Sequence, residues 1–200
     1  MIDPKKVTDY KRNKFQLQEW LLYGICVAGK KSEIETVKLD KFLQGCSGKG
    51  SATTPFNLIR KLLKTSSVIF KDGLMEGLSK NKIAPYKQRY NSFVDAVTLL
   101  PDDLSEVTID DLQKVRGIKT KTSRFFLTHS REDFDEPVLD RHINKFLRDQ
   151  GHTDVPVDTP QNPKVYARVA KLFTDIAKER GQSVTDLDLQ VWKQYSYGKV

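Results

Sequence analysis

Hydrophobic residues recur along this chain at the spacing of an α-helix. Near the N-terminus, apolar residues three or four positions apart predict an amphipathic helix, and they are Leu17, Trp20, Leu21, Gly24, Ile25 and Ala28. Three further stripes each follow a proline, a residue favoured where a helix begins, and these prolines are Pro55, Pro85 and Pro163. No run of alternating β-branched residues is long enough to predict a sheet. The pattern therefore predicts an all-α protein.

The ends of the last two helices also have sequence signals. Gly181 follows the stripe that begins at Pro163 and is typical of a helix C-terminus. Thr185 and Asp188 fit the spacing of a capping box, which would begin the final helix.

The chain has a net charge of +8, from 34 Lys and Arg against 26 Asp and Glu. The basic residues form clusters along the whole chain rather than one tail. Such a surface favours a polyanionic partner through counterion release, and solubility is the plainer explanation. Charge alone therefore favours nucleic acid as a partner without establishing it.

The sequence argues against an iron–sulfur cluster, a metal site and a membrane location. The two cysteines, Cys26 and Cys46, are too few for an iron–sulfur cluster, which needs four thiolates, and Cys26 lies in an apolar run that predicts a core position. The histidines are not at metal-ligand spacing; they are His129, His142 and His152. The longest apolar run, residues 20–28, is too short to span a membrane, and no signal peptide precedes it. We therefore expect no metal and a soluble, intracellular protein.

A glycine-rich stretch at residues 45–51 suggests a phosphate-binding loop as one alternative. It lacks the spacing of a Walker loop, and no strand precedes it, although that motif requires both. We therefore predict an ordinary connecting loop there.

Two short helices joined by a tight turn are predicted between residues 108 and 130. Thr108, with Asp111 three positions later, is typical of a helix start, and Gly117 ends that helix. Ile118 would fill the turn, and the second helix would begin near Thr120. On that helix we expect Thr122, Phe125, Phe126 and His129 to be buried and Lys121, Arg124 and Thr128 to be exposed.

This helix-hairpin-helix can bind DNA. Backbone N–H groups at the start of its second helix can hold a phosphate, assisted by the helix dipole, without reading the bases. The candidate phosphate-binding residues are Arg116, Gly117, Ile118, Lys119, Thr120 and Arg124.

Lys121 and Asp140 are the candidates for chemistry. Each has a plainer role when it is taken singly. Lys121 could be another phosphate contact, and Asp140 could be the N-cap of the helix that carries Ile143. Together, in this order beside the hairpin, they offer an amine nucleophile and a carboxylate.

Residues 115–123, followed by residues 139–143, resemble the helix-hairpin-helix DNA glycosylases of the endonuclease III superfamily. The likeness is closest to the type-2 8-oxoguanine DNA glycosylase/AP lyases, and it extends to residues 86–90 and 185–192. One position departs from the family turn, because Lys119 stands where a second glycine is usual. We expect strain there, since a left-handed lysine costs on the order of 1 kcal/mol.

The resemblance implies an all-α fold of two helical lobes with an active-site cleft between them. Residues 29–130 would form the lobe that ends in the hairpin. Residues 131–200 would form the C-terminal lobe, and the N-terminal helix in residues 1–28 would pack with it.

It also implies base-excision repair with AP-lyase activity. A damaged base is flipped out, Lys121 attacks the sugar C1′, and the resulting Schiff base allows β-elimination of the 3′-phosphate. Asp140 would stabilise the cationic sugar and move protons. The attacking amine must be neutral, a form that the nearby Lys119 and Arg124 favour. Trp192 and Lys199 are candidates for the base pocket.

The implied partner is double-stranded DNA, with 8-oxoguanine as the leading lesion, bound by a monomer in the cytoplasm or nucleoid. No cofactor is expected, although a monovalent cation can be accommodated at the hairpin. Two alternatives stay open. One is a glycosylase for another lesion or a modified base, and the other is a non-catalytic helix-hairpin-helix DNA-binding protein.

Overall fold

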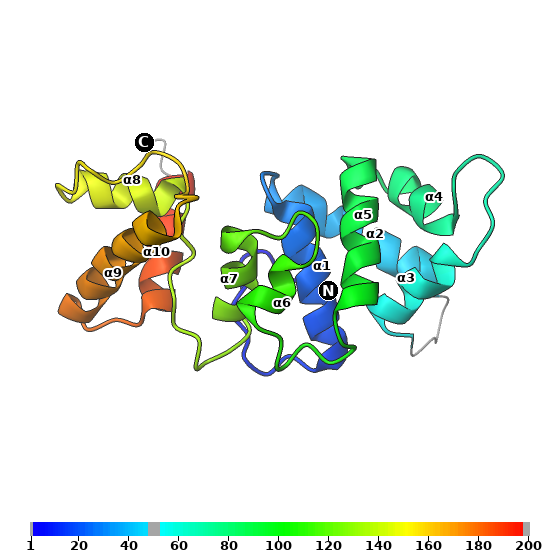
Figure 1. The fold of residues 1–200 in the computed structure, drawn as a ribbon, viewed down its shortest axis with the longest axis horizontal. Helices are drawn as coiled ribbons and strands as arrows, with labels where there is room; N and C mark the ends of the chain where they lie inside the picture. The colour runs from blue at the N-terminus through cyan, green and yellow to red at the C-terminus, as the bar shows by residue number, and fades with distance from the viewer. Residues whose placement is uncertain (1, 48–52, 198–200) are drawn as a thin grey trace. The chain divides into compact units, whose positions relative to one another are not determined.

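The computed structural model describes residues 2–47 and 53–197 of the chain. These residues form ten α-helices and no strand, so the predicted all-α fold is confirmed (Figure 1). The helices are α1 (Lys14–Val27), α2 (Ser32–Ser47), α3 (Pro55–Leu63), α4 (Gly73–Lys80), α5 (Tyr86–Leu99), α6 (Ile109–Gln113), α7 (Thr120–Thr128), α8 (Arg141–Asp149), α9 (Pro163–Glu179) and α10 (Val184–Tyr197).

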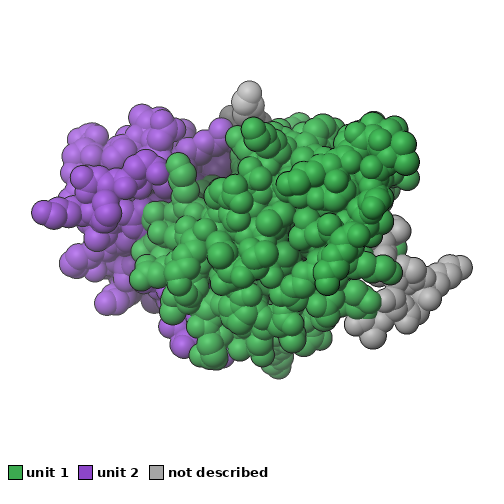
Figure 2. Space-filling model, turned by 45° about the vertical axis from the view of Figure 1, so that its right-hand side comes forward, with its two compact units in different colours: residues 1–126 green, residues 127–200 purple. Residues whose placement is uncertain are grey.

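The chain divides into two compact units, which Figure 2 colours separately. Unit 1 is Met1–Phe126 and unit 2 is Leu127–Val200. Helix α1 packs against α2, α3 and α5, all within unit 1. The predicted packing of residues 1–28 with the C-terminal lobe stays a prediction.

Helix α1 is the core of unit 1. All residues from Leu17 to Cys26 are buried, so the prediction of a helix with one exposed face is wrong. A helix surrounded by neighbours buries its polar side chains too, and these then need partners. Gln18 meets this need, because its Nε2 donates to the carbonyl of Asp102 at 2.6 Å and its Oε1 accepts from the amide of Phe56 at 3.0 Å. Cys26 is fully buried, and burial raises its pKa to about 12.

Helix α5 lies between the other helices of unit 1 (Figure 1) and packs against α1, α3 and α4. Its Tyr90 hydroxyl donates to Oδ2 of Asp72 at 2.5 Å, and Oδ1 of Asp72 caps α4 by accepting from the amide of Met75. Nearer the C-terminal end of α5, the carbonyl of Val97 accepts from the guanidinium of Arg60 on α3. These hydrogen bonds from α5 to neighbouring segments therefore fix the position of α5 within unit 1.

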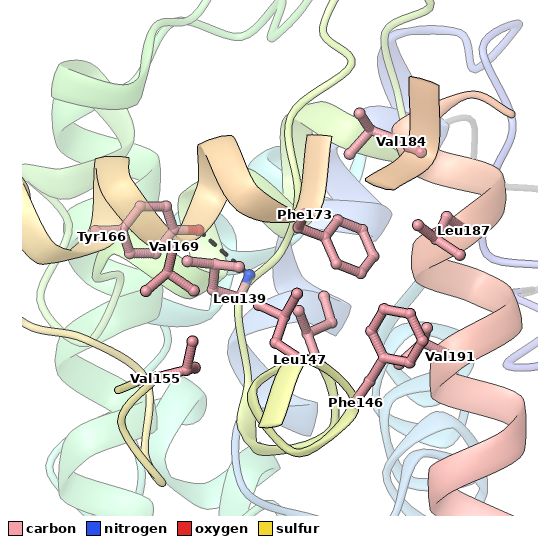
Figure 3. Close-up of a cluster of buried hydrophobic side chains, with 12 residues drawn as sticks. Leu139, Phe146, Leu147, Val155, Tyr166, Val169, Phe173, Val184, Leu187 and Val191 are labelled. Atoms are coloured by element: carbon pink, nitrogen blue, oxygen red, sulfur yellow. Dashed lines mark hydrogen bonds between the residues drawn. The ribbon is translucent and has the colours of Figure 1, made fainter. Parts of the chain in front are cut away.

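Unit 2 has its own core, drawn in Figure 3, where α8, α9 and α10 meet. Phe146 of α8 and Phe173 of α9 pack edge to face, with ring centroids 6.0 Å apart. The buried members of this core are Leu139, Ile143, Phe146, Leu147, Val155, Tyr166, Val169, Phe173, Ala177, Val184, Leu187 and Val191.

Several predicted helix ends are confirmed. Helix α3 begins with Pro55 behind the N-cap Thr54, and α5 begins behind Pro85. Helix α9 begins with Pro163 and ends before Gly181, whose φ is +65°. A left-handed residue after the last turn is the usual way a helix ends on glycine.

The predicted capping box of Thr185 and Asp188 is wrong. Helix α10 already begins at Val184, and Oγ of Ser183 accepts from the amide of Asp186 at 3.0 Å. The first two amides of the helix are bound by a carboxylate from another part of the chain. Asp135 accepts from the amides of Val184 at 3.0 Å and Thr185 at 2.9 Å. Asp188 instead accepts from the amide of Val138 at 2.8 Å. A local pattern could not reveal these partners, because they lie about fifty positions away.

Candidate active site

The first helix of the hairpin, α6, begins with the predicted capping box. Oγ1 of Thr108 accepts from the amide of Asp111 at 3.2 Å, and Oδ2 of Asp111 accepts from the amide of Thr108 at 3.1 Å. Leu112 and Val115 are buried, as expected for the inner edge of this short helix.

The turn that follows needs only one glycine. Gly117 has φ +87°, and a Cβ added there would lie 3.0 Å from Oγ of Ser92. Ile118 is buried in the turn, and its amide donates to the carbonyl of Val115 at 3.0 Å. Within the described part of the chain, Lys82 is the one non-glycine residue with positive φ. The strain expected at Lys119 is therefore absent, and the exposed lysine fits the turn without a second glycine.

The second helix, α7, begins at Thr120 as predicted. Phe126 and His129 are buried and Lys121 is exposed, as expected. Thr122 and Phe125, predicted to be buried, and Arg124, predicted to be exposed, are all half-buried. Thr128 was predicted to be exposed, and this is wrong: it is fully buried, and its hydroxyl donates to the carbonyl of Glu136 at 2.8 Å. Ser123 is also fully buried, and its Oγ accepts from Nε2 of Gln113, which joins the two helices of the hairpin.

Helix α1 supports α7 through an aromatic contact. Nε1 of Trp20 donates to the carbonyl of Phe126 at 3.1 Å, and its ring lies 4.8 Å from that of Phe125. A Cβ at Gly24 would lie 3.7 Å from the Phe125 ring, an ordinary van der Waals contact, so this approach does not depend on glycine. The guanidinium of Arg12 lies 4.3 Å from the centroid of the Trp20 ring. The sequence identified Trp20 as a core residue, but not as a support of the hairpin.

Helix α5 holds the turn through Asp95. Oδ2 of Asp95 accepts from the amide of Arg116 at 3.0 Å and from Nε of Arg116 at 2.6 Å, while Oδ1 accepts from Nη2 at 2.7 Å. These hydrogen bonds from Arg116 hold the pKa of Asp95 below its ordinary value. One turn earlier, the hydroxyl of Ser92 donates to the carbonyl of Arg116 at 2.6 Å. Arg116 was predicted as a phosphate ligand, and the structure pairs it with a carboxylate.

Asp140 is the N-cap of α8. Its backbone is extended, and its Oδ1 accepts from the amides of His142 at 2.7 Å and Ile143 at 3.1 Å. The side chain is buried at this helix end. The N-cap role predicted for Asp140 is therefore confirmed, and it is compatible with a second, chemical role.

The segment before Asp140 is fixed by the rest of unit 2. The hydroxyl of Tyr166 on α9 donates to the carbonyl of Pro137 at 2.9 Å and accepts from the amide of Leu139 at 3.3 Å (Figure 3). The hydroxyl of Thr159 donates to the carbonyl of Leu139 at 3.2 Å. The amide and the carbonyl of Leu139 are thus both hydrogen-bonded, which fixes the backbone immediately before Asp140. No local sequence signal identified Tyr166 or Thr159 as its partners.

The other candidate residues lie in different units or outside the described residues. Lys121 lies in unit 1 and Asp140 lies in unit 2. Arg124 is half-buried on α7, and Trp192 is half-buried on α10. Lys199 and residues 48–51 of the glycine-rich stretch lie outside the described residues. Residues 45–47, predicted to be loop, are instead the last residues of α2, so the loop prediction is wrong there.

Among residues 2–47 and 53–197, no group of three His, Cys, Asp or Glu side chains could hold a metal ion. In the same ranges, no helix is long and apolar enough to cross a membrane.

Sequence comparison gives a partial match. No protein-family model matches the chain. Over 79 residues it is 33% identical to a protein of Aquifex aeolicus (strain VF5) named 8-oxoguanine DNA glycosylase/AP lyase. The aligned segment is 40% of this chain and 34% of that protein, so it spans about a third of the relative's length.

Structure comparison covers nearly the whole chain and shows an all-helical fold of the kind found in DNA glycosylases. The 8-oxoguanine DNA glycosylase of Thermotoga maritima superposes on 95% of this chain and 84% of its own, with a TM-score of 0.66 and 18% identity. The enzyme of Methanocaldococcus jannaschii superposes on 98% of this chain and 85% of its own, with a TM-score of 0.69 and 18% identity. The same enzyme bound to a 15mer DNA containing 8-oxoguanine gives 0.70 at 16% identity, covering 98% and 90% of the two chains. The chain therefore has the fold of the 8-oxoguanine DNA glycosylases, and the resemblance predicted from the sequence is confirmed at that level.

Proposed function

We propose that this chain is a DNA base-excision glycosylase with AP-lyase activity. One observation carries the proposal. In a fold shared with 8-oxoguanine DNA glycosylases, an exposed lysine occupies the first turn of the second hairpin helix, and an aspartate caps the helix that follows. These are the two residue types that a Schiff-base mechanism requires.

The hairpin would bind a DNA phosphate through backbone groups. The first turn of an α-helix directs its backbone N–H groups outward from the helix N-terminus, and in α7 this turn includes Thr120, Lys121 and Thr122. Gly117 keeps side-chain atoms away from the turn, and exposed Lys119 adds a positive charge beside it. Helix dipole, amides and lysine together favour an anion at this position.

Lys121 would act as the nucleophile. Its neutral Nζ attacks the sugar C1′ and the bond from C1′ to the base breaks, so the base leaves with the bonding electrons and gains a proton. In the C1′–Nζ adduct a proton passes from the nitrogen to the ring oxygen O4′ as the C1′–O4′ bond breaks, which opens the sugar and leaves a protonated Schiff base. Removal of a proton from C2′ then expels the 3′-phosphate, which cuts the strand.

Asp140 would assist this reaction as a carboxylate. Its position is set by the cap, in which Oδ1 accepts two amides. A fixed anion stabilises the positive charge that develops on the sugar as the base departs, and it can relay protons between the sugar and the lysine.

The proposed substrate is double-stranded DNA with a flipped damaged base, and 8-oxoguanine is the leading lesion because the matched relatives are named for it. Trp192 and Lys199 remain the proposed base-pocket residues. The enzyme would act as a monomer, inside the cell where DNA is found. We also propose that the hairpin can bind a monovalent cation, since the carbonyl groups of the turn are suitable oxygen ligands. The carbonyl of Arg116 already accepts a hydrogen bond from Ser92.

A base-release assay tests the substrate. Duplexes with 8-oxoguanine, other oxidised or alkylated bases, or only normal bases are incubated with the protein, and the free base and the strand break are measured separately. We expect release of 8-oxoguanine and cleavage at the same site. Release of a different base would retain the enzyme and change its substrate. Salt-sensitive binding without product from any duplex would favour the non-catalytic DNA-binding alternative.

A further inference from the structure

The side chain of Arg116 in the hairpin turn is bound by a residue of α5, Asp95. Three N–H groups of Arg116, at the backbone, Nε and Nη2, donate to the carboxylate of Asp95 over 2.6 to 3.0 Å. The Arg116 side chain is 60% exposed, whereas that of Asp95 is 11% exposed. The carboxylate thus lies beneath the turn, and the guanidinium covers it.

This pairing makes Arg116 a poor phosphate ligand. Arginine recognises phosphate best through a fork of two parallel N–H bonds. In Arg116 the Nε and Nη2 fork is already occupied by Asp95, and the anion offsets the positive charge of the guanidinium. By contrast, exposed Lys119 three positions later has no such pairing to a carboxylate in the described ion pairs.

The same contacts fix the backbone of the turn. Asp95 holds the amide of Arg116, and the hydroxyl of Ser92 holds its carbonyl at 2.6 Å. The next residue, Gly117, comes so close that a Cβ would lie 3.0 Å from the Ser92 hydroxyl. Both supporting residues are buried and lie one turn apart on α5, the helix that packs against α1, α3 and α4. The turn is therefore attached to the framework of unit 1 before any ligand arrives.

We propose that Asp95 is a positioning residue for DNA binding, which acts through Arg116 to hold the hairpin turn so that the first amides of α7 are oriented for a phosphate. In this arrangement Arg116 is part of the support and not a phosphate contact. The inference rests on the proposed function and adds to it the residue that preorganises the hairpin.

The test is a double-mutant cycle on DNA affinity. The ligand is a duplex with a tetrahydrofuran abasic analogue, which cannot form a Schiff base, and Kd is measured over a range of salt concentrations. We expect Asp95→Asn and Arg116→Gln each to raise Kd by on the order of tenfold, because the amides lose their fixed orientation. The double variant should be no weaker than either single one, since both remove the same support.

The slope of log Kd against log salt separates support from direct contact. Losing one phosphate contact lowers the slope by about 1. If Arg116 supports the turn without contacting phosphate, the slope stays unchanged in Asp95→Asn and Arg116→Gln. Arg116→Lys keeps the charge but loses the two parallel N–H donors, so it should bind DNA as poorly as Arg116→Gln. Asp102→Asn is the matched control, because it breaks another aspartate–arginine pair of unit 1, with Arg60 at 2.7 Å, and should leave Kd within about twofold.

Several results would overturn the inference. A slope lowered by about 1 in Arg116→Gln, with affinity kept in Arg116→Lys, would make Arg116 a phosphate ligand. Tighter binding by Asp95→Asn would mean that the carboxylate restrains the arginine from DNA. If Asp95→Asn and Asp102→Asn lose the same amount of DNA affinity, Asp95 is only a general stabilising residue. Absence of duplex binding by the unaltered protein is a different result, which would overturn the proposed function as well.

Discussion

Gly117 provides a direct test of the hairpin at the scale of one residue. Its φ of +87° is a conformation that costs a residue with a Cβ roughly 1–2 kcal/mol, and the added atom would also meet Ser92 Oγ at 3.0 Å. Gly117→Ala should therefore lower the free energy of unfolding by at least about 1 kcal/mol, as measured by chemical denaturation.

Removing the Ser92 hydroxyl separates the two causes. In the double variant Ser92→Ala with Gly117→Ala the close contact is relieved, while the backbone conformation remains. Its loss of stability, measured against Ser92→Ala alone, should be smaller than that of Gly117→Ala in the unaltered protein. Gly117→Ala with full stability would show that the turn does not require glycine.

Lys119 tests whether the hairpin contacts phosphate rather than bases. Lys119→Glu should weaken binding to every duplex sequence by a similar factor, because a phosphate contact has no sequence information. The slope of log Kd against log salt should fall by about 1 or more. Lys41→Glu on α2 makes the same charge change on another exposed lysine and serves as the control. A loss that depends on the sequence would contradict the phosphate role.

At the scale of helices, Asp140 connects stability and chemistry in α8. Asparagine caps helices about as well as aspartate, whereas alanine costs typically about 1 kcal/mol. Asp140→Asn should therefore keep a melting temperature near that of the unaltered protein and lose turnover by orders of magnitude. Asp140→Ala should lose both.

These two variants are distinguished by thermal unfolding together with single-turnover cleavage. If Asp140→Asn unfolds as readily as Asp140→Ala, the carboxylate is mainly structural. If Asp140→Asn cleaves at the original rate, the charge has no part in the reaction.

The helices themselves were largely predictable, because their signals are local. Prolines at helix starts, the Thr108–Asp111 box and Gly181 all act within a few positions. The stripe of α1 predicted a helix, but its burial on all sides depends on α2, α3 and α5 packing around it. Periodicity within one segment does not show how many neighbours a helix has.

The candidate site was predictable only in part, for the same reason. The turn pattern predicted Gly117, and residue type and order predicted Lys121 and Asp140. All three residues lie at the predicted helix ends. Their supports come from distant positions: Asp95 is 21 positions from Arg116, and Tyr166 is 27 from Leu139. Such partners have no local pattern, so the sequence did not reveal that Asp95 pairs with Arg116 or that Asp135 binds the start of α10.

At the scale of the whole molecule, the fold, the net charge of +8 and the hairpin support the same proposal. The fold is shared with glycosylases over almost the whole chain, and the charge favours a polyanion. Neither feature distinguishes an enzyme from a DNA-binding protein with the same fold. That distinction depends on whether Lys121 forms a covalent bond with the sugar.

Borohydride trapping measures that bond directly. The protein is incubated with borohydride and labelled duplexes that contain 8-oxoguanine, an abasic site or only normal bases, and covalent adducts are separated by electrophoresis. Our account predicts an adduct with the 8-oxoguanine and abasic duplexes, none with normal DNA, and its loss in Lys121→Gln, which still binds DNA. Trapping that survives in Lys121→Gln, or no adduct with either damaged duplex, would contradict Lys121 as the nucleophile.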